Sequence, residues 1–393
     1  MTLKYADRMS RMKASDIREL LKLTQDPTII SFAGGLPAEE LFPVEELMEI
    51  SQKVLEDLGG KALQYSTTEG HIPLRKAIAK RMKKLGIDMT EENILITNGS
   101  QQGLEFSGKL FINEGDVVLC ERPTYLGAID AFKAYGPEFI EIQTDDNGMI
   151  MEDLERVLKE TKKVKFIYLV PDFQNPSGRT WNRERRKRLV ELANQYDVAI
   201  IEDNPYGELR FEGELLPAVA HYDTTGNVVF LGTLSKIFCP GLRIGWIAAK
   251  KEVIEKYVLI KQSSDLQTNT LSQMQASMFL EEYDIEAHIE KIKNLYRTRR
   301  DLMMKTMKEE FPEGVSWTYP EGGLFIWVVL PEHMNGRELA IKALEQNVAY
   351  VPGGAFFANG GQENTFRLNF SSMDEARIVE GIKRLGKVLR EEI

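Results

Sequence analysis

The sequence predicts an α/β protein, with a mostly parallel central sheet wrapped by helices and a smaller α+β domain. Three observations support this fold class. Short apolar runs alternate with longer helical patterns through most of the chain, which is typical of a parallel sheet with crossover helices. Polar and glycine-containing segments follow these runs, where the strands are expected to end. After about residue 275 the pattern changes to a long charged helical region, followed by strands mixed with helices.

Each predicted strand is an almost continuous apolar stretch, as expected when helices cover both faces of a sheet. Helical patterns such as GMIMEDLERVLKETKK and WNRERRKRLVELANQY lie between the strands. In such sheets ligands bind at the carboxyl ends of the strands, and the polar segments of this chain fall there. The strands and their polar ends, in chain order, are NILITNGSQQG, DVVLCERPTY, KFIYLVPDFQNPSG, VAIIEDNPY, VVFLGTLSK and RIGWIAAK.

We divide the chain into three parts. Residues 1–44 form an N-terminal segment that is not part of the predicted sheet, and we expect it to pack beside the sheet and with the small domain. Residues 45–275 form the large domain that contains the sheet. Residues 276–393 form the small C-terminal domain, which begins with the charged helical region IEKIKNLYRTRRDLMMKTMKEEF and continues through the strand-like SWTYPEGGLFIWVVL.

The composition is that of a globular protein. The chain has 393 residues, of which 43% are hydrophobic, enough for a sizeable core. The net charge is −10 and no long basic run occurs, so we expect no nucleic-acid partner. The two cysteines form no metal-binding or disulfide pattern, and no apolar run is long enough to span a membrane. We therefore expect a cytoplasmic protein without a bound metal.

The segment NGSQQG, residues 98–103, follows a predicted strand and opens a helical pattern. Backbone amides at a helix N-terminus, with Ser100 as an added donor, suit a phosphate group. The alternative is an ordinary strand–helix turn in which Ser100 caps the helix. The P-loop and dinucleotide-binding glycine patterns are both absent from the chain.

Further polar and aromatic side chains follow other predicted strands. Asp203 follows VAII with one residue, Glu202, between them, and Tyr206 lies three residues later. A carboxylate there caps a helix, binds a metal or pairs with a cationic ring nitrogen. Asn175 precedes a proline, which is a turn signal when taken alone. Tyr125 either stacks on a flat ligand or fills the core.

Lys236 and Arg243 belong to the mostly apolar run FLGTLSKIFCPGLRIGW, residues 230–246. Either Lys236 lies in an exposed loop or it is partnered or chemically employed, because an unpaired buried ammonium costs several kcal/mol. Together the candidates at the strand ends supply a phosphate-binding turn, an aromatic ring for stacking, an amide donor, a carboxylate and a lysine. Pyridoxal phosphate requires this set: the lysine forms a Schiff base, and the carboxylate keeps the pyridine nitrogen protonated.

The motifs TLSKIFCPGLRIG, EDNPY, FQNPSG, NGSQQ and VPGGAFF followed by FRLNF are spread through nearly the whole chain. Together they resemble class I/II pyridoxal-phosphate-dependent aminotransferases of fold type I. The segments SFAGGLPAEELFP and LQYSTTEGHIPLR resemble the subgroup of 2-aminoadipate, aromatic and branched-chain aminotransferases. The resemblance implies ping-pong transfer of an amino group between an L-amino acid and a 2-oxo acid. The expected donors are glutamate, 2-aminoadipate, aromatic or branched-chain amino acids, and the expected acceptor is 2-oxoglutarate.

The resemblance also assigns roles around the cofactor. Lys236 forms the Schiff base and carries the proton, and Asp203 pairs with the pyridine nitrogen. Tyr206 and Asn175 bind the ring hydroxyl oxygen, and Tyr125 stacks on the ring. The residues expected to hold the phosphate are Ser100, Gln101, Thr233, Ser235 and Arg243.

Other assigned residues concern the substrate and a second subunit. Arg367 is expected to clamp the substrate α-carboxylate, helped by Asn175 and the backbone of Gly35. Tyr65 is expected to reach the phosphate of the neighbouring subunit, which implies a homodimer with shared active sites. The resemblance places the N-terminal segment over the active site, where Arg18 binds a substrate side-chain carboxylate and Ser15 assists it. Alternatively, Arg18 is a solvated helix residue and Ser15 a helix cap.

Three other functions were compared with this one. Another fold-type I enzyme, such as a C–S β-lyase or an acyl transferase, would share most of the motifs. The effector domain of winged-helix regulators is disfavoured because no DNA-binding extension precedes the first motifs. A sugar aminotransferase is disfavoured because FRLNF supplies an arginine for the substrate carboxylate.

Overall fold

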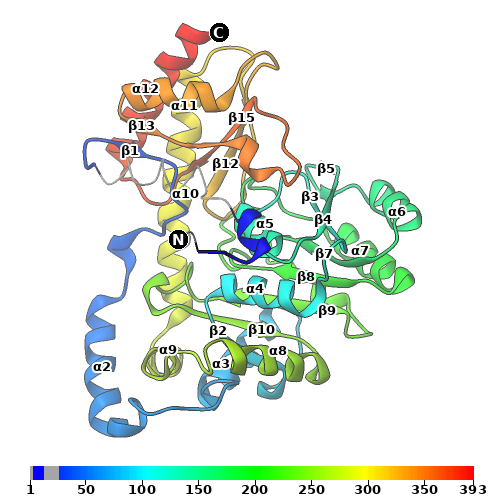
Figure 1. Ribbon diagram of the computed structural model, residues 1–393. Helices are drawn as coiled ribbons and strands as arrows, with labels where there is room; N and C mark the ends of the chain where they lie inside the picture. Colours follow the sequence, from blue (N-terminus) through cyan, green and yellow to red (C-terminus); the bar gives the residue numbers. More distant parts are fainter. Residues whose placement is uncertain (1–2, 13–25) are drawn as a thin grey trace.

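The computed structural model describes residues 3–12 and 26–393, and its centre is a seven-stranded sheet (Figure 1). The strand order is β2-β10-β9-β8-β7-β3-β4. Strand β10 runs antiparallel to both of its neighbours, and all other pairs are parallel. The predicted α/β class is thereby confirmed. The strands are β2 (Ile94–Asn98), β3 (Val117–Glu121), β4 (Glu138–Ile142), β7 (Val164–Leu169), β8 (Ala199–Asp203), β9 (Val228–Thr233) and β10 (Ile244–Ala248).

Helices cover both faces of this sheet. Successive residues of a strand point to opposite faces, so neighbouring apolar residues pack against different helices. On one face Val118 and Phe166 belong to the same core as the apolar residues of α4 (Ser100–Phe111). On the other face Leu119 and Ile167 pack with α6 and α7. This explains the continuous apolar runs of the sequence. The remaining helices around the sheet are α2 (Val44–Leu58), α3 (Ile72–Met82), α5 (Leu126–Lys133), α6 (Met151–Glu160), α7 (Arg183–Tyr196), α8 (Lys251–Ser264) and α9 (Thr270–Glu282).

The C-terminal part contains a four-stranded antiparallel sheet of order β11-β12-β15-β14. The long helix α10 extends from the level of the central sheet toward this second sheet (Figure 1). Helix α12 packs against α10. The elements are α10 (Ile285–Glu310), β11 (Ser316–Trp317), β12 (Phe325–Val329), α11 (Gly336–Glu345), β13 (Val348–Ala349), β14 (Val351–Pro352), β15 (Thr365–Asn369) and α12 (Glu375–Glu392).

The N-terminal segment is joined to the C-terminal part by a strand pair. Strand β1 (Ile30–Ser31) runs parallel to β13. Directly after β4, the antiparallel strands β5 (Thr144–Asp145) and β6 (Gly148–Met149) form a separate two-stranded sheet. Helix α9 runs across residue 275, and the domain boundaries at residues 44 and 275 stay predictions.

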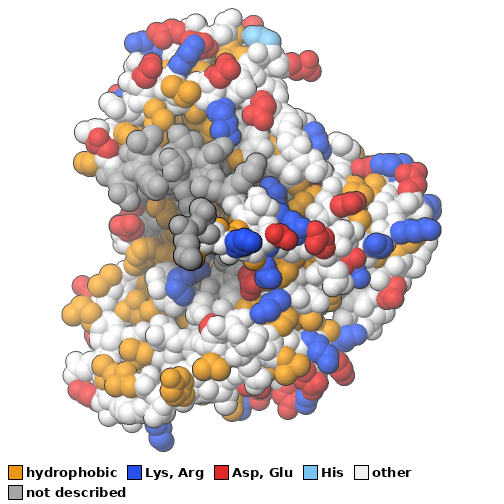
Figure 2. Space-filling model, in the orientation of Figure 1, with side chains coloured by type: hydrophobic (Ala, Val, Ile, Leu, Met, Phe, Trp, Pro, Cys, Tyr) orange, Lys and Arg blue, Asp and Glu red, His pale blue; other side chains and the backbone are white. Residues whose placement is uncertain are grey.

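Charged side chains of both signs are interspersed over the visible face of the molecule (Figure 2). The acidic excess of the chain therefore does not gather into one broad patch on this face. Within residues 3–12 and 26–393, no helix is long and apolar enough to cross a membrane.

Candidate active site

A cleft of about 310 Å³ lies at the carboxyl ends of β8 and β9. It is lined by residues from the strand ends of the central sheet, from the N-terminal segment and from the C-terminal sheet. Fourteen of its lining residues are Ala33, Gly34, Gly35, Ser100, Gln101, Tyr125, Leu126, Asn175, Asp203, Tyr206, Ser235, Lys236, Arg243 and Arg367. The cleft brings together the strand-end candidates that the sequence singled out.

Lys236 lies three residues after the end of β9 and projects its amine into the cleft. Its Nζ donates a hydrogen bond to the carbonyl oxygen of Gly35 at 2.8 Å. Burial lowers the pKa of the amine to about 8, and the positive charges of Arg367 and Arg243 act in the same direction. Lys236 is thus a partly buried lysine whose neutral amine is accessible near neutral pH.

Asp203 is the last residue of β8 and is buried. Its Oδ2 accepts a hydrogen bond from the Tyr168 hydroxyl at 3.0 Å. Its Oδ1 is also buried but has no hydrogen-bond partner among the described residues. Burial raises the pKa of this carboxyl to about 7, and the Tyr168 hydrogen bond opposes the increase. An unpaired buried acceptor at a cleft is costly unless a ligand donates to it.

The segment after β2 forms a narrow turn into α4, and Ser100 and Gln101 are the first helical residues. Gly99 has φ +74°, and a Cβ atom at this position would lie 2.3 Å from Nη2 of Arg243. A Cβ at Gly245 would lie 2.6 Å from the backbone nitrogen of Ser100. The glycines therefore allow Arg243 to reach the N-terminus of α4, where Nη2 donates to the carbonyl oxygen of Asn98 at 3.2 Å. This positive helix end suits an anion.

Thr233 and Ser235 lie on the turn that leads from β9 to Lys236. The Thr233 hydroxyl oxygen accepts the backbone N–H of Ser235 at 3.1 Å and lies 3.0 Å from the Ile244 carbonyl oxygen. The two side-chain oxygens are 2.9 Å apart. The Thr233 side chain is thus used within the turn, and a phosphate contact for it stays a prediction.

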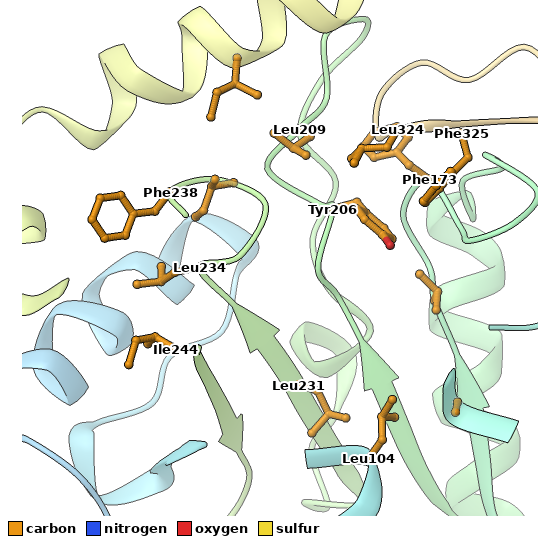
Figure 3. Packing of buried hydrophobic residues seen from close by; sticks show 14 of the residues in the cluster. Leu104, Phe173, Tyr206, Leu209, Leu231, Leu234, Phe238, Ile244, Leu324 and Phe325 are labelled. Atoms are coloured by element: carbon orange, nitrogen blue, oxygen red, sulfur yellow. The ribbon is translucent and has the colours of Figure 1, made fainter. Parts of the chain in front are cut away.

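Tyr125 immediately precedes α5 and lines the cleft. Its hydroxyl donates to Oε1 of Gln101 at 3.4 Å, and Nε2 of Gln101 donates to the Gly127 carbonyl oxygen at 2.8 Å. A Cβ at Gly127 would lie 2.5 Å from the tyrosine ring. This glycine therefore allows the ring to approach the start of α5 closely. Tyr206 contacts Phe325 edge-on at 5.8 Å, and Figure 3 shows the two rings side by side.

Arg367 enters the cleft from β15 and is buried. Its Nη1 donates to Oδ1 of Asn175 at 2.7 Å, and its Nη2 donates to the Ala33 carbonyl oxygen at 2.5 Å. The guanidinium lies between two aromatic rings, 4.3 Å from the centroid of Phe325 and 5.1 Å from that of Phe356. Burial lowers its pKa to about 10, so the group stays cationic at neutral pH. Arg367 is thus a fixed cation with a planar fork.

The roles predicted for Tyr65, Arg18 and Ser15 stay predictions. Tyr65 is 80% exposed and does not line this cleft. Arg18 and Ser15 lie outside the described residues. The sequence analysis missed Tyr168, which supports Asp203, and the aromatic pair around Arg367. Tyr168 lies inside a strand, whereas the sequence patterns point to residues at strand ends.

Known proteins were then compared with the chain. Residues 28–385 match the family of class I and II aminotransferases, and the chain belongs to this family. The aromatic-amino-acid aminotransferase 1 of Thermococcus litoralis is 50% identical over 99% of this chain and 94% of its own length.

Two solved structures are similar to it over almost their entire length. Kynurenine aminotransferase from Pyrococcus horikoshii has a TM-score of 0.95 and 46% identity, covering 99% of this chain and 97% of that one. The alpha-aminoadipate aminotransferase from Thermus thermophilus, solved with N-(5'-phosphopyridoxyl)-L-leucine, has a TM-score of 0.93 and 41% identity. The match covers 98% of this chain and 97% of that one. The chain is accordingly a pyridoxal-phosphate-dependent aminotransferase of fold type I, acting on amino acids.

The cleft fits this cofactor. It presents an amine at Lys236, a buried carboxylate oxygen without a partner among the described residues at Asp203, and a helix N-terminus beside Arg243. These groups match an aldehyde, a ring nitrogen and a phosphate. No cluster of three or more potential metal ligands occurs within the described ranges.

Proposed function

We propose that this aminotransferase takes the amino group of aromatic and 2-aminoadipate-like L-amino acids and passes it to 2-oxoglutarate. One observation carries the proposal: Lys236, the buried Oδ1 of Asp203 and Arg367 all face one cleft. The relatives add the substrate class, because their names include aromatic amino acids, kynurenine and alpha-aminoadipate. We also propose a cytoplasmic homodimer.

The two ends of the cofactor are held by different parts of the cleft. The phosphate is bound by the first turn of α4 and by Arg243, with Ser100, Gln101 and Ser235 as further donors. The positive end of the helix and the arginine charge both favour the anion. Thr233 fixes the turn and supports Ser235.

At the ring end, Oδ1 of Asp203 accepts a hydrogen bond from the protonated pyridine nitrogen, and Tyr125 stacks on the ring. Tyr206 and Asn175 bind the ring hydroxyl oxygen. Bound pyridoxal phosphate supplies an electron sink for the charge that develops at the substrate Cα. Asp203 stabilises that sink because its negative charge faces the ring in a buried environment.

Lys236 has two successive roles at one atom. Its Nζ would hold the bound cofactor, and as a free amine it would be the base that takes the substrate Cα proton. The lowered pKa suits this second role, because a base near its operating pH transfers protons efficiently. The Gly35 carbonyl oxygen at 2.8 Å orients the amine toward the cleft.

Arg367 binds the substrate α-carboxylate with its guanidinium fork. Hydrogen bonds from Nη1 to Asn175 and from Nη2 to the Ala33 carbonyl oxygen fix the orientation of the planar guanidinium, so little reorganisation is required on binding. Around it the cleft has apolar walls at Leu126 and Phe325. These walls suit the aromatic or aliphatic part of a substrate side chain.

Two exposed apolar side chains support the homodimer. Leu63 is 72% exposed and Tyr65 is 80% exposed, and both lie off the cleft of their own subunit. Large exposed apolar groups near each other are typical of protein interfaces. In the proposed dimer Tyr65 contacts the phosphate of the neighbouring subunit, as the resemblance implied.

A substrate panel tests this function. The purified holoenzyme is mixed with single L-amino acids, and loss of its yellow colour and release of the 2-oxo acid are measured. We expect aromatic amino acids, 2-aminoadipate and glutamate to react. If the colour is unchanged with all of these donors but changes with an unrelated amine, the proposed substrate class is wrong. Sedimentation of the same sample tests the dimer.

A further inference from the structure

Tyr168 is a buried tyrosine inside β7 that the sequence patterns did not connect with the site. In the parallel pairing of β7 with β8, Tyr168 lies opposite Ile201. Residues opposite each other point to the same face, and so does the residue two positions further along. Its side chain therefore shares a face with Asp203. The ring packs edge-on against Phe132 at 5.7 Å, which fixes its orientation.

The hydrogen bonds at Asp203 are unequal. Its Oδ2 accepts from the Tyr168 hydroxyl at 3.0 Å, whereas Oδ1 has no partner in the described part of the chain. The adjacent buried carboxylate, Glu202, differs because both of its oxygens accept backbone N–H groups, those of Val219 and Ala220, at 2.8 Å. Both carboxylate oxygens of Glu202 thus have hydrogen-bond donors within the protein. Asp203 has such a donor at Oδ2, and its Oδ1 is left for a ligand.

A hydrogen bond donated to a carboxylate has two physical effects. It stabilises the ionised form over the protonated one, because the charged oxygen is the stronger acceptor. It also prevents rotation of the carboxylate, so that the second oxygen points in a constant direction. Both effects are large in a buried site, where water does not compete for the carboxylate.

We propose that Tyr168 is a positioning residue of the cofactor site. Its hydroxyl directs Oδ1 of Asp203 toward the cofactor and lowers the proton affinity of that carboxylate, so that the shared proton stays on the ring nitrogen. Without the hydroxyl, Asp203 becomes the more basic partner and the proton moves toward it. The inference rests on the pairing of Asp203 with the ring nitrogen that is proposed above.

The test uses holoenzyme loaded with pyridoxal phosphate that carries nitrogen-15 in the ring. The nitrogen chemical shift reports whether the ring is protonated, and the free cofactor in acid and in alkali supplies the two reference values. Four proteins are compared: wild type, Tyr168→Phe, Asp203→Asn and Tyr257→Phe. Tyr257 is a matched control, because it is a fully buried tyrosine whose hydroxyl pairs with that of Ser107 at 2.8 Å.

Tyr168→Phe keeps the ring that packs on Phe132, so the fold is retained. We expect its nitrogen signal to move toward the unprotonated value and its kcat to fall about tenfold, the low end for a hydrogen bond to a charged group. Tyr257→Phe is expected to keep the wild-type signal. A merely structural role for Tyr168 would leave the signal in place.

The outcomes separate the two proposals. If Asp203→Asn moves the signal but Tyr168→Phe leaves it at the wild-type value, the role of Tyr168 is refuted and that of Asp203 stands. If Asp203→Asn leaves the signal unchanged, the pairing of Asp203 with the ring is wrong, and the inference fails with it. If Tyr257→Phe moves the signal as far as Tyr168→Phe does, the effect is not specific to the contact with Asp203, and the role of Tyr168 is refuted.

Discussion

Replacing Arg367 by lysine removes the planar fork of the guanidinium but keeps the positive charge. In the structure the fork is fixed by Asn175 and Ala33 and lies between Phe325 and Phe356. A lysine amine is a point charge and cannot satisfy these acceptors and both oxygens of a carboxylate together. One charge-assisted hydrogen bond to the substrate is then lost, which costs about 1.5–3 kcal/mol.

This loss corresponds to a decrease of about ten- to a hundredfold in kcat/KM for the amino acid. We expect most of it in KM, because the carboxylate is bound in the ground state as well as in the transition state. Cofactor loading is expected to persist, since Arg367 is assigned to the substrate and not to the cofactor. Steady-state kinetics with one aromatic donor, together with the absorbance spectrum of the variant, measure both effects.

Arg300→Lys is the matched control. Arg300 is also buried, and it lies between Phe211 and Tyr319 at 4.9 and 4.6 Å from the ring centroids, away from the cleft. Its replacement is expected to lower the melting temperature and to leave kcat/KM little changed. The reasoning is refuted if both variants reduce kcat/KM by the same factor, because the effect would then come from the loss of any buried arginine.

Three further predictions concern the cofactor site. Gly99→Ala is expected to weaken cofactor binding, because φ at this position is +74° and the new Cβ would lie 2.3 Å from Arg243 Nη2. A cofactor titration of the apoenzyme checks this, and an unchanged affinity for the cofactor would contradict it. The rate at which apoenzyme takes up cofactor is expected to rise with pH through about 8, as the Lys236 amine loses its proton; a rate independent of pH in this range would contradict the assignment. In apoenzyme the pKa of Asp203 is raised from 3.8 to about 7 in the folded state, so its contribution to stability is lost as pH rises through this interval. Asp203→Asn apoenzyme should therefore melt at a higher temperature than wild type above about pH 7. The difference in melting temperature should disappear below pH 3.8, where Asp203 is protonated in both the folded and the unfolded chain. A melting-temperature difference that stays constant across this range would show that another group is responsible.

The sequence predicts the site well where its residues follow strands. Asp203, Lys236 and Ser100 come directly after, or shortly after, apolar runs. Strand ends of a parallel sheet meet at one edge, so local order along the chain specifies neighbours in space. The structure places all three in one cleft.

Contacts between distant segments are not predicted in this way. Asn175 and Arg367 are 192 residues apart, yet they are hydrogen bonded. Phe325 and Phe356 belong to the C-terminal part and contact Arg367 through tertiary packing, which no local period reveals. Tyr168 is hidden within the apolar run IYLV, where a tyrosine is expected to serve the core.

The antiparallel direction of β10 could have been predicted from the length of the loop that precedes it. An apolar run does not distinguish a parallel from an antiparallel strand, and RIGWIAAK resembles the other runs. Only residues 234–243 connect β9 with β10. This connection is too short for a helical crossover between parallel strands, so loop length required the antiparallel pairing that the structure has.

The most direct test of the account is to locate the cofactor on the chain. The holoenzyme is reduced with borohydride, digested, and its peptides are identified by mass spectrometry. We expect the cofactor mass on Lys236, and its loss when an aromatic amino acid is added before reduction. Lys261 provides an internal comparison, because it is a buried lysine paired with Asp265 outside the cleft. Label on Lys261, or label on Lys236 that no amino acid removes, would contradict the account.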